Sequence, residues 1–118
     1  MDICYICKLQ KTYKAIANFE IRVHKSVGLN FNEMTLLCIL SDLETRLAGE
    51  IADKLDLTRS NASKVISSLE KKSYIRRSIC KEDSRCQRFH ITKKGIEVLQ
   101  VICNDIEIPN EVKTCMSM

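Results

Sequence analysis

Residues 45–69 constrain the fold most, because two short stretches with the apolar spacing of a helix follow each other almost without a linker. The first stretch begins at Thr45 and ends near Leu55, and its apolar residues share one face of a helix. The second carries four apolar residues at the spacing of one helix face, namely Ala62, Val65, Ile66 and Leu69. Residues 56–57 break the pattern, and the hydroxyl of Thr58 can cap the second helix. The sequence therefore predicts two helices that meet at a tight turn.

Two longer helices are expected before this pair. In residues 3–27, apolar side chains recur every three or four positions, which indicates one amphipathic helix that ends at Gly28. Asn30 followed three residues later by Glu33 is typical of a helix start. The apolar residues that come next indicate a buried second helix.

After the pair, the spacing changes from helical to extended and back. Residues 74–79 and 87–91 are rich in β-branched and aromatic side chains and flank a charged tip, which predicts a β-hairpin. Thr92 can then cap a last helix over residues 92–106. Residues 107–118 are weakly patterned and are expected to form a flexible tail. The 118 residues are expected to form a single domain with an α+β fold, mainly α with a small β-hairpin wing.

Positive charge is concentrated in one part of the chain. Residues 58–94 contain eleven Lys or Arg and three acidic residues, a net charge of +8, whereas the other residues carry a net charge of −4. This asymmetry favours a polyanionic partner over a merely solvated surface. The second helix of the pair adds a polar outer face opposite its apolar stripe, and short polar side chains on a helix suit the major groove of duplex DNA.

Residues 47–95 resemble the winged helix-turn-helix of MarR-family transcriptional regulators. The resemblance rests on LAGEIADKLDLTRSNASKVISSLEKK from position 47, YIRR from 74, EDSR from 82 and ITKKG from 91. It implies a DNA-binding lobe over residues 30–95 and a homodimer formed by the helices of residues 3–27 and 92–106. It also implies a sequence-specific regulator of transcription, expected to be a repressor, with a palindromic double-stranded operator. A small-molecule effector is compatible with the resemblance, although no residue in the sequence identifies one. Ser73 stands where the family usually has Gly, so the turn there either avoids positive φ or accepts strain.

The expected DNA-binding residues form three groups. Those expected to read bases lie on the second helix of the pair: Ser60, Asn61, Ser63 and Lys64, with Thr58, Arg59 and Ser67 beside them. Those placed to meet phosphates, and so to give affinity and salt dependence, are Arg76, Arg77, Lys81 and Arg88. The resemblance places the family's wing motif on Asp83 and Arg85. It implies that Arg85 reaches the minor groove while Asp83 holds the wing in shape.

Seven cysteines lack an assigned role. Cys80 and Cys86 bracket the hairpin tip, where cross-strand cysteines can approach disulfide distance, and Cys7 lies near Tyr5. Two alternatives stay open: a thiol-based, redox-responsive regulator of the same fold, or inert cysteines in a reducing cell. No metal or cofactor is expected, because the Cys and His residues do not have zinc-site spacing.

The sequence shows no catalytic grouping and no Gly-rich phosphate loop, so the chain is not expected to be an enzyme. Its longest unbroken apolar run, residues 36–40, is too short to cross a membrane, and a cytoplasmic location is expected. The competing function is a winged-helix protein-interaction module without specific DNA binding, in which the basic face binds an acidic partner.

Overall fold

The computed structural model describes residues 1–79 and 86–116 and divides the chain into two units. Unit 1 consists of Met1–Asn30 and Ile102–Met118, and unit 2 of Phe31–Val101. The division falls inside helix α5 (Lys93–Asp105). The limits of unit 2 lie close to those predicted for the lobe at residues 30–95.

Unit 1 contains the long helix α1 (Ile3–Val27), whose bounds are those predicted. The side chain of Asp2 accepts a hydrogen bond from the backbone N–H of Cys4 at 3.2 Å, which caps the start of the helix. Gly28 ends it with a φ of 75°, and its N–H donates to the carbonyl of His24. Among the described residues, no helix is long and apolar enough to span a membrane.

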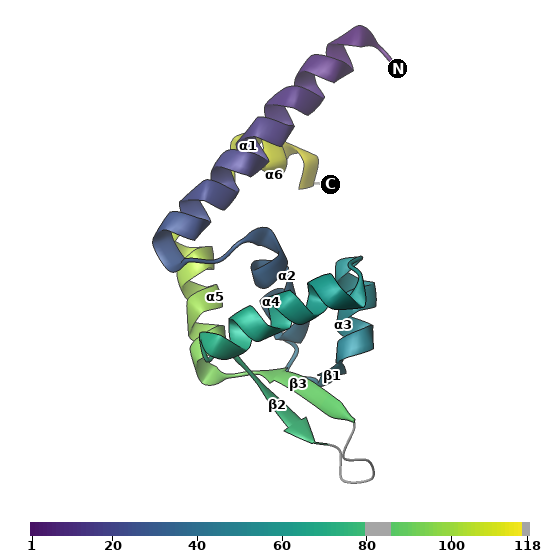
Figure 1. The fold of residues 1–118 in the computed structure, drawn as a ribbon. Coiled ribbons are helices and arrows are strands. Elements are labelled where there is room, and N and C mark those ends of the chain that lie inside the picture. The colour runs from purple at the N-terminus through teal and green to yellow at the C-terminus, as the bar shows by residue number, and fades with distance from the viewer. Residues whose placement is uncertain (80–85, 117–118) are drawn as a thin grey trace. The chain divides into compact units, whose positions relative to one another are not determined.

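The expected flexible tail is wrong for residues 110–116, which form helix α6 (Asn110–Met116). The carbonyl of Pro109 accepts hydrogen bonds from the N–H groups of Val112 and Lys113, so the proline stands at the start of this helix. Proline is tolerated there because the first residues of a helix need no N–H partner within it. Helix α6 packs against α1 (Figure 1).

Unit 2 combines helices with a small antiparallel sheet. Its helices are α2 (Phe31–Leu40), α3 (Ala48–Leu55), α4 (Arg59–Lys71) and the first part of α5. Its strands are β1 (Arg46–Leu47), β2 (Ile75–Ile79) and β3 (Gln87–Ile91), in the sheet order β1-β3-β2. In Figure 1, the hairpin of β2 and β3 projects away from the helices of this unit. The predicted fold class, mainly α with a small β-hairpin, is confirmed.

The core of unit 2 is formed by the apolar faces that the sequence pattern indicated. Helix α2 contributes Leu36, Leu37 and Leu40, and the hairpin contributes Ile75, Phe89 and Ile91. The buried residues of α4 are its predicted apolar stripe, Ala62, Val65, Ile66 and Leu69. Helix α4 therefore has one face in the core and the other at the surface.

Strand β1 corrects the predicted start of the third helix. The helix was expected to begin at Thr45, but Arg46 and Leu47 pair with Phe89 and Arg88 of β3, and α3 begins at Ala48. The Glu50 carboxylate accepts a hydrogen bond from the Leu47 N–H at 3.0 Å, which satisfies a donor at the helix start. A two-residue strand is too short to show an alternating pattern in the sequence.

The turn between α4 and β2 resolves the question raised by Ser73, which has a φ of 65° and so accepts the left-handed conformation. Thr92 holds this turn against the start of α5. Its hydroxyl donates to the Ser73 carbonyl at 2.7 Å, and its backbone N–H donates to the Tyr74 carbonyl at 3.0 Å. The same hydroxyl accepts from the Gly95 N–H at 3.1 Å, which confirms the predicted Thr92 cap. A side chain at Gly95 would collide with the Tyr74 carbonyl.

Replacing Ser73 with glycine is expected to raise the free energy of unfolding by about 1 kcal/mol, because glycine adopts positive φ without a steric penalty. The measurement is urea denaturation followed by circular dichroism. Ser73→Ala is the matched control, since it keeps the Cβ atom and should give no such gain. Equal stability of the glycine and alanine variants would contradict the expectation.

Candidate nucleic-acid interface

The turn between α3 and α4 comprises residues 56–58. Asp56 has a φ of 55°, and the N–H of Leu57 donates to the Ala52 carbonyl at 3.0 Å, which closes the end of α3. The Thr58 hydroxyl accepts from the Asn61 N–H at 3.1 Å and so caps α4. The tight turn and the Thr58 cap are both confirmed.

The outer face of α4 carries short polar side chains and cations. All seven predicted residues of this segment are exposed: Thr58, Arg59, Ser60, Asn61, Ser63, Lys64 and Ser67. The stripe on the opposite side of the helix is buried, so this outer face plays no part in the core. It is a ridge of hydrogen-bonding groups without apolar or acidic side chains.

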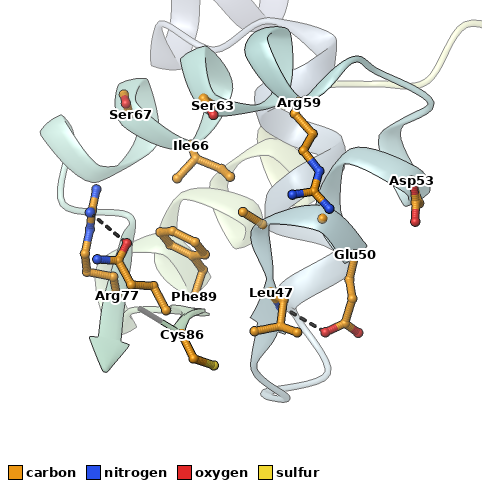
Figure 2. A pocket seen from close by; sticks show the side chains of 13 residues that line it. Leu47, Glu50, Asp53, Arg59, Ser63, Ile66, Ser67, Arg77, Cys86 and Phe89 are labelled. Carbon is orange, nitrogen blue, oxygen red and sulfur yellow. Dashed lines mark hydrogen bonds between the residues drawn. The ribbon is translucent and has the colours of Figure 1, made fainter. Parts of the chain in front are cut away.

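A groove of about 730 Å³ lies beside α4, between that helix, the start of α3 and the hairpin (Figure 2). Ser63 and Ser67 line its α4 side, and the buried side chains of Ile66 and Phe89 form an apolar part of its wall. Arg59 extends along it close to Gly49. A Cβ atom at position 49 would lie 2.9 Å from Nη2 of Arg59, so the glycine leaves room for the guanidinium.

Arg77, predicted to meet phosphates, is hydrogen-bonded to two other side chains of the protein. Its Nε and Nη2 donate to the two carboxylate oxygens of Glu70 at 2.7 and 2.6 Å, and its Nη1 donates to the Gln87 side-chain oxygen at 3.0 Å. The hydrogen bond to Glu70 is the main cause that raises the pKa of the Arg77 guanidinium. The guanidinium also lies over the ring of Phe89, 5.7 Å from its centre.

The other two described hairpin arginines lie on the opposite face from Arg77. The register pairs Arg77 with Phe89, and it pairs Arg76 with His90 and Ser78 with Arg88. Because side chains alternate along a strand, Arg76 and Arg88 share the face that points away from the core. Both are exposed, and Arg88 also donates to the Thr45 hydroxyl at 3.4 Å.

Four of the predicted site residues lie outside the described part of the chain: Cys80, Lys81, Asp83 and Arg85. Cys86 forms a disulfide bond, and Cys7 is an exposed free cysteine on α1. Within residues 1–79 and 86–116, no group of three or more His, Cys, Asp or Glu side chains is arranged to hold a metal ion.

Glu33 is a supporting residue whose role the sequence analysis missed. Its side chain is buried, and its Oε2 accepts from the Ser68 hydroxyl at 2.8 Å and from Nζ of Lys72 at 2.7 Å. This carboxylate therefore attaches α2 to the C-terminal half of α4. The sequence indicated only a helix-start residue, because its partners lie 35 and 39 residues further along the chain.

Two helices joined by a tight turn, followed by a hairpin whose strands pack beside the second helix, define a winged helix-turn-helix. The MarR family model matches residues 29–87, which include α2, β1, both helices of the pair and β2. The chain belongs to the MarR family, as the resemblance of residues 47–95 indicated.

Named relatives agree with this assignment. The chain is 39% identical over 92 residues to the uncharacterized HTH-type transcriptional regulator YpoP of Bacillus subtilis, an alignment that covers 78% of this chain and 64% of YpoP. It is 33% identical over 89 residues to the HTH-type transcriptional regulator PapX of Escherichia coli, over 74% of this chain and 54% of PapX. The match thus spans less than two thirds of either relative. Both are named as regulators, in agreement with the prediction that this chain is not an enzyme.

Solved structures share the fold. The S. aureus MepR–DNA complex superimposes with a TM-score of 0.70 at 18% identity, over 93% of this chain and 88% of that one. A second structure of MepR, described as a transcription regulator of the S. aureus multidrug efflux pump MepA, gives a TM-score of 0.76 at 16% identity, over 99% of this chain and 84% of that one. At these identities the likeness concerns the fold.

Replacing Thr58 with alanine is expected to lower the free energy of unfolding by about 1 kcal/mol, because the Asn61 N–H loses its acceptor at the start of α4. Thr58→Ser keeps the hydroxyl and is the matched control. Chemical denaturation of the three proteins measures the difference. If alanine and serine at this position give the same stability, the cap does not contribute as described.

Proposed function

We propose that this chain is a sequence-specific, double-stranded-DNA-binding regulator of transcription, with α4 in the major groove and the hairpin at the adjacent minor groove. The observation that carries the proposal is the outer face of α4, where exposed short polar side chains lie opposite a fully buried stripe. Such side chains can approach base edges, which larger ones would block. The MepR–DNA complex, a protein of the same fold, supports the same partner.

The proposed contacts divide between bases and backbone. Ser60, Asn61, Ser63 and Lys64 read base edges, with Thr58 and Ser67 beside them. Arg59, at the groove between α4 and the hairpin, meets a backbone phosphate, as do Arg76 and Arg88 on the outer hairpin face. The resemblance adds Lys81 at a phosphate, Arg85 in the minor groove and Asp83 in support of the wing.

The protein is further proposed to act as a homodimer through α1. Exposed apolar side chains line one side of this helix, including Ile6 at 55%, Leu9 at 61% and Tyr13 at 68%. Helix α6 does not cover them, because it lies on the polar side, beside Lys11, Lys14 and Arg22. A second copy presents the same apolar stripe, and two such stripes can bury each other about a two-fold axis.

A two-fold dimer would present two copies of α4 to the duplex. Its operator is then a palindrome with half-sites about one helical turn, or ~34 Å, apart. Occupation of that site would block access of other proteins to the same DNA, which is the basis for proposing repression.

Selection from a random duplex pool is the direct test, and a palindromic sequence is expected to be enriched. Asn61→Ala should lower discrimination at one base position of the half-site by about ten- to a hundredfold, because one base-edge contact is lost. Lys54→Ala, on the exposed side of α3 and outside the groove, is the control and should bind like the wild type. A protein that enriches no sequence and binds no duplex at low salt would refute the proposal and favour the protein-interaction module.

Leu9→Glu is expected to convert the dimer to a monomer, because a carboxylate in the centre of the apolar stripe would be buried without a partner. Sedimentation analysis of the wild type and the variant measures the change. Lys25→Glu is the control, since it also introduces a carboxylate, here at an exposed position on the opposite side of α1. A monomeric wild type, or a Leu9→Glu protein that sediments as a dimer, would contradict the proposed interface.

A further inference from the structure

We infer that Arg77 is a positioning residue that fixes the recognition helix α4 to the wing hairpin, and that it does not contact phosphate. The inference rests on the proposed function, because it concerns how that helix and hairpin act on one duplex. Arg77 was one of the cations predicted to contact phosphates. Among those that the structure describes, it is the one paired with a carboxylate.

The contacts of Arg77 join three elements. The residue belongs to β2, its two-point ion pair is with Glu70 of α4, and its third hydrogen bond is with Gln87 of β3. A planar guanidinium paired through two nitrogens restrains both the distance and the orientation of its partner. These contacts, defined here as the Arg77 hub, set the placement of the last turns of α4 relative to both hairpin strands.

Charge argues against a phosphate contact. The Glu70 carboxylate already neutralises the Arg77 guanidinium. The side chain of Glu70 is 20% exposed, and that of Arg77 is 48% exposed. A phosphate would have to displace that carboxylate or share the guanidinium with it. A neutral pair releases no counterions from DNA, so it adds little to affinity or to its salt dependence. Arg76, on the other hairpin face, has no acidic cross-strand partner in the register.

Geometry explains what the hub does for recognition. The side chains proposed to read bases lie on α4, whereas Arg76 and Arg88 lie on the hairpin. The grooves and phosphates of a duplex have a fixed spacing, so both sets of contacts form together only if the two elements keep one relative placement. A loosened hub would leave each element able to bind DNA but would weaken their joint fit to the selected sequence.

The test compares affinity for the selected operator with affinity for a random-sequence duplex, each measured over a range of salt concentrations. Arg77→Ala and Arg77→Lys are both expected to lower the ratio of the two affinities by about tenfold, with the salt slope unchanged. Lysine keeps the charge but not the two-point pair, so it should not rescue. Glu70→Gln should likewise weaken binding to the operator. Thermal unfolding of each variant, compared with the wild type, checks that the measured protein is folded.

Arg76 provides the matched control, one residue away on the opposite face of β2. Arg76→Ala should reduce the salt slope by about 1 and leave the affinity ratio unchanged, and Arg76→Lys should restore the slope. If Arg77→Ala behaves in this way instead, or if Glu70→Gln tightens operator binding, Arg77 is a phosphate contact and the inference is overturned. It is also overturned if the Arg77 variants keep the wild-type ratio.

A charge-swapped protein, Glu70→Arg with Arg77→Glu, is a second measurement. It should recover part of the ratio lost in the single variants, whereas a phosphate contact at Arg77 could not be restored by a carboxylate there. Wild-type protein that shows no preference for any selected duplex refutes the proposed function itself. A selective wild type with hub variants that stay selective refutes only the role of Arg77.

Discussion

The rotation of α4 about its own axis depends on one buried carboxylate. Glu33 is 4% exposed and is paired with Ser68 of that helix and with Lys72, the residue that follows it. A carboxylate buried without partners is strongly unfavourable, so rotations of α4 that separate these groups are disfavoured. The apolar stripe of the same helix requires the same rotation in order to reach the core. Packing and electrostatics thus agree on one orientation, and the polar face is turned outward as a result.

The two ends of α4 are held in different ways. At the first turn, the Thr58 hydroxyl satisfies a backbone donor, a local interaction that defines where the helix starts. At the last turns, Glu33 from α2 and Arg77 from β2 approach from separate elements and bind Ser68 and Glu70 of the helix. The start of the helix is therefore defined by a residue next to it in the sequence, while its end is held by residues that are distant in the sequence. The outer face of α4 is therefore held in place by both a helix, α2, and a strand, β2.

The parts of this structure that sequence reasoning reached are those encoded by neighbours along the chain. The bounds of α1, the caps at Thr58 and Thr92, and the buried stripe of α4 all follow from spacings of a few residues. Strand β1 was missed because two residues show no periodicity, and α6 because its short pattern is weak. The partners of Glu33 and Arg77 were missed for another reason. Charged side chains find partners through the fold, and nothing in the spacing of Glu70 and Arg77 distinguishes an ion pair from two solvated residues.

The exposure of the outer face of α4 bears on how the binding preference of such a protein can evolve. Its serines, asparagine and lysine are exposed and stand apart from the buried stripe, the Glu33 carboxylate and the Thr58 hydroxyl that hold the helix in place. Substitutions on that face therefore change surface chemistry at little cost to folding, since exposed positions away from caps and buried networks tolerate most side chains. A descendant can acquire a new binding preference by a few such changes while it inherits an intact scaffold. Divergence in recognition and persistence of the fold are then compatible within one short helix.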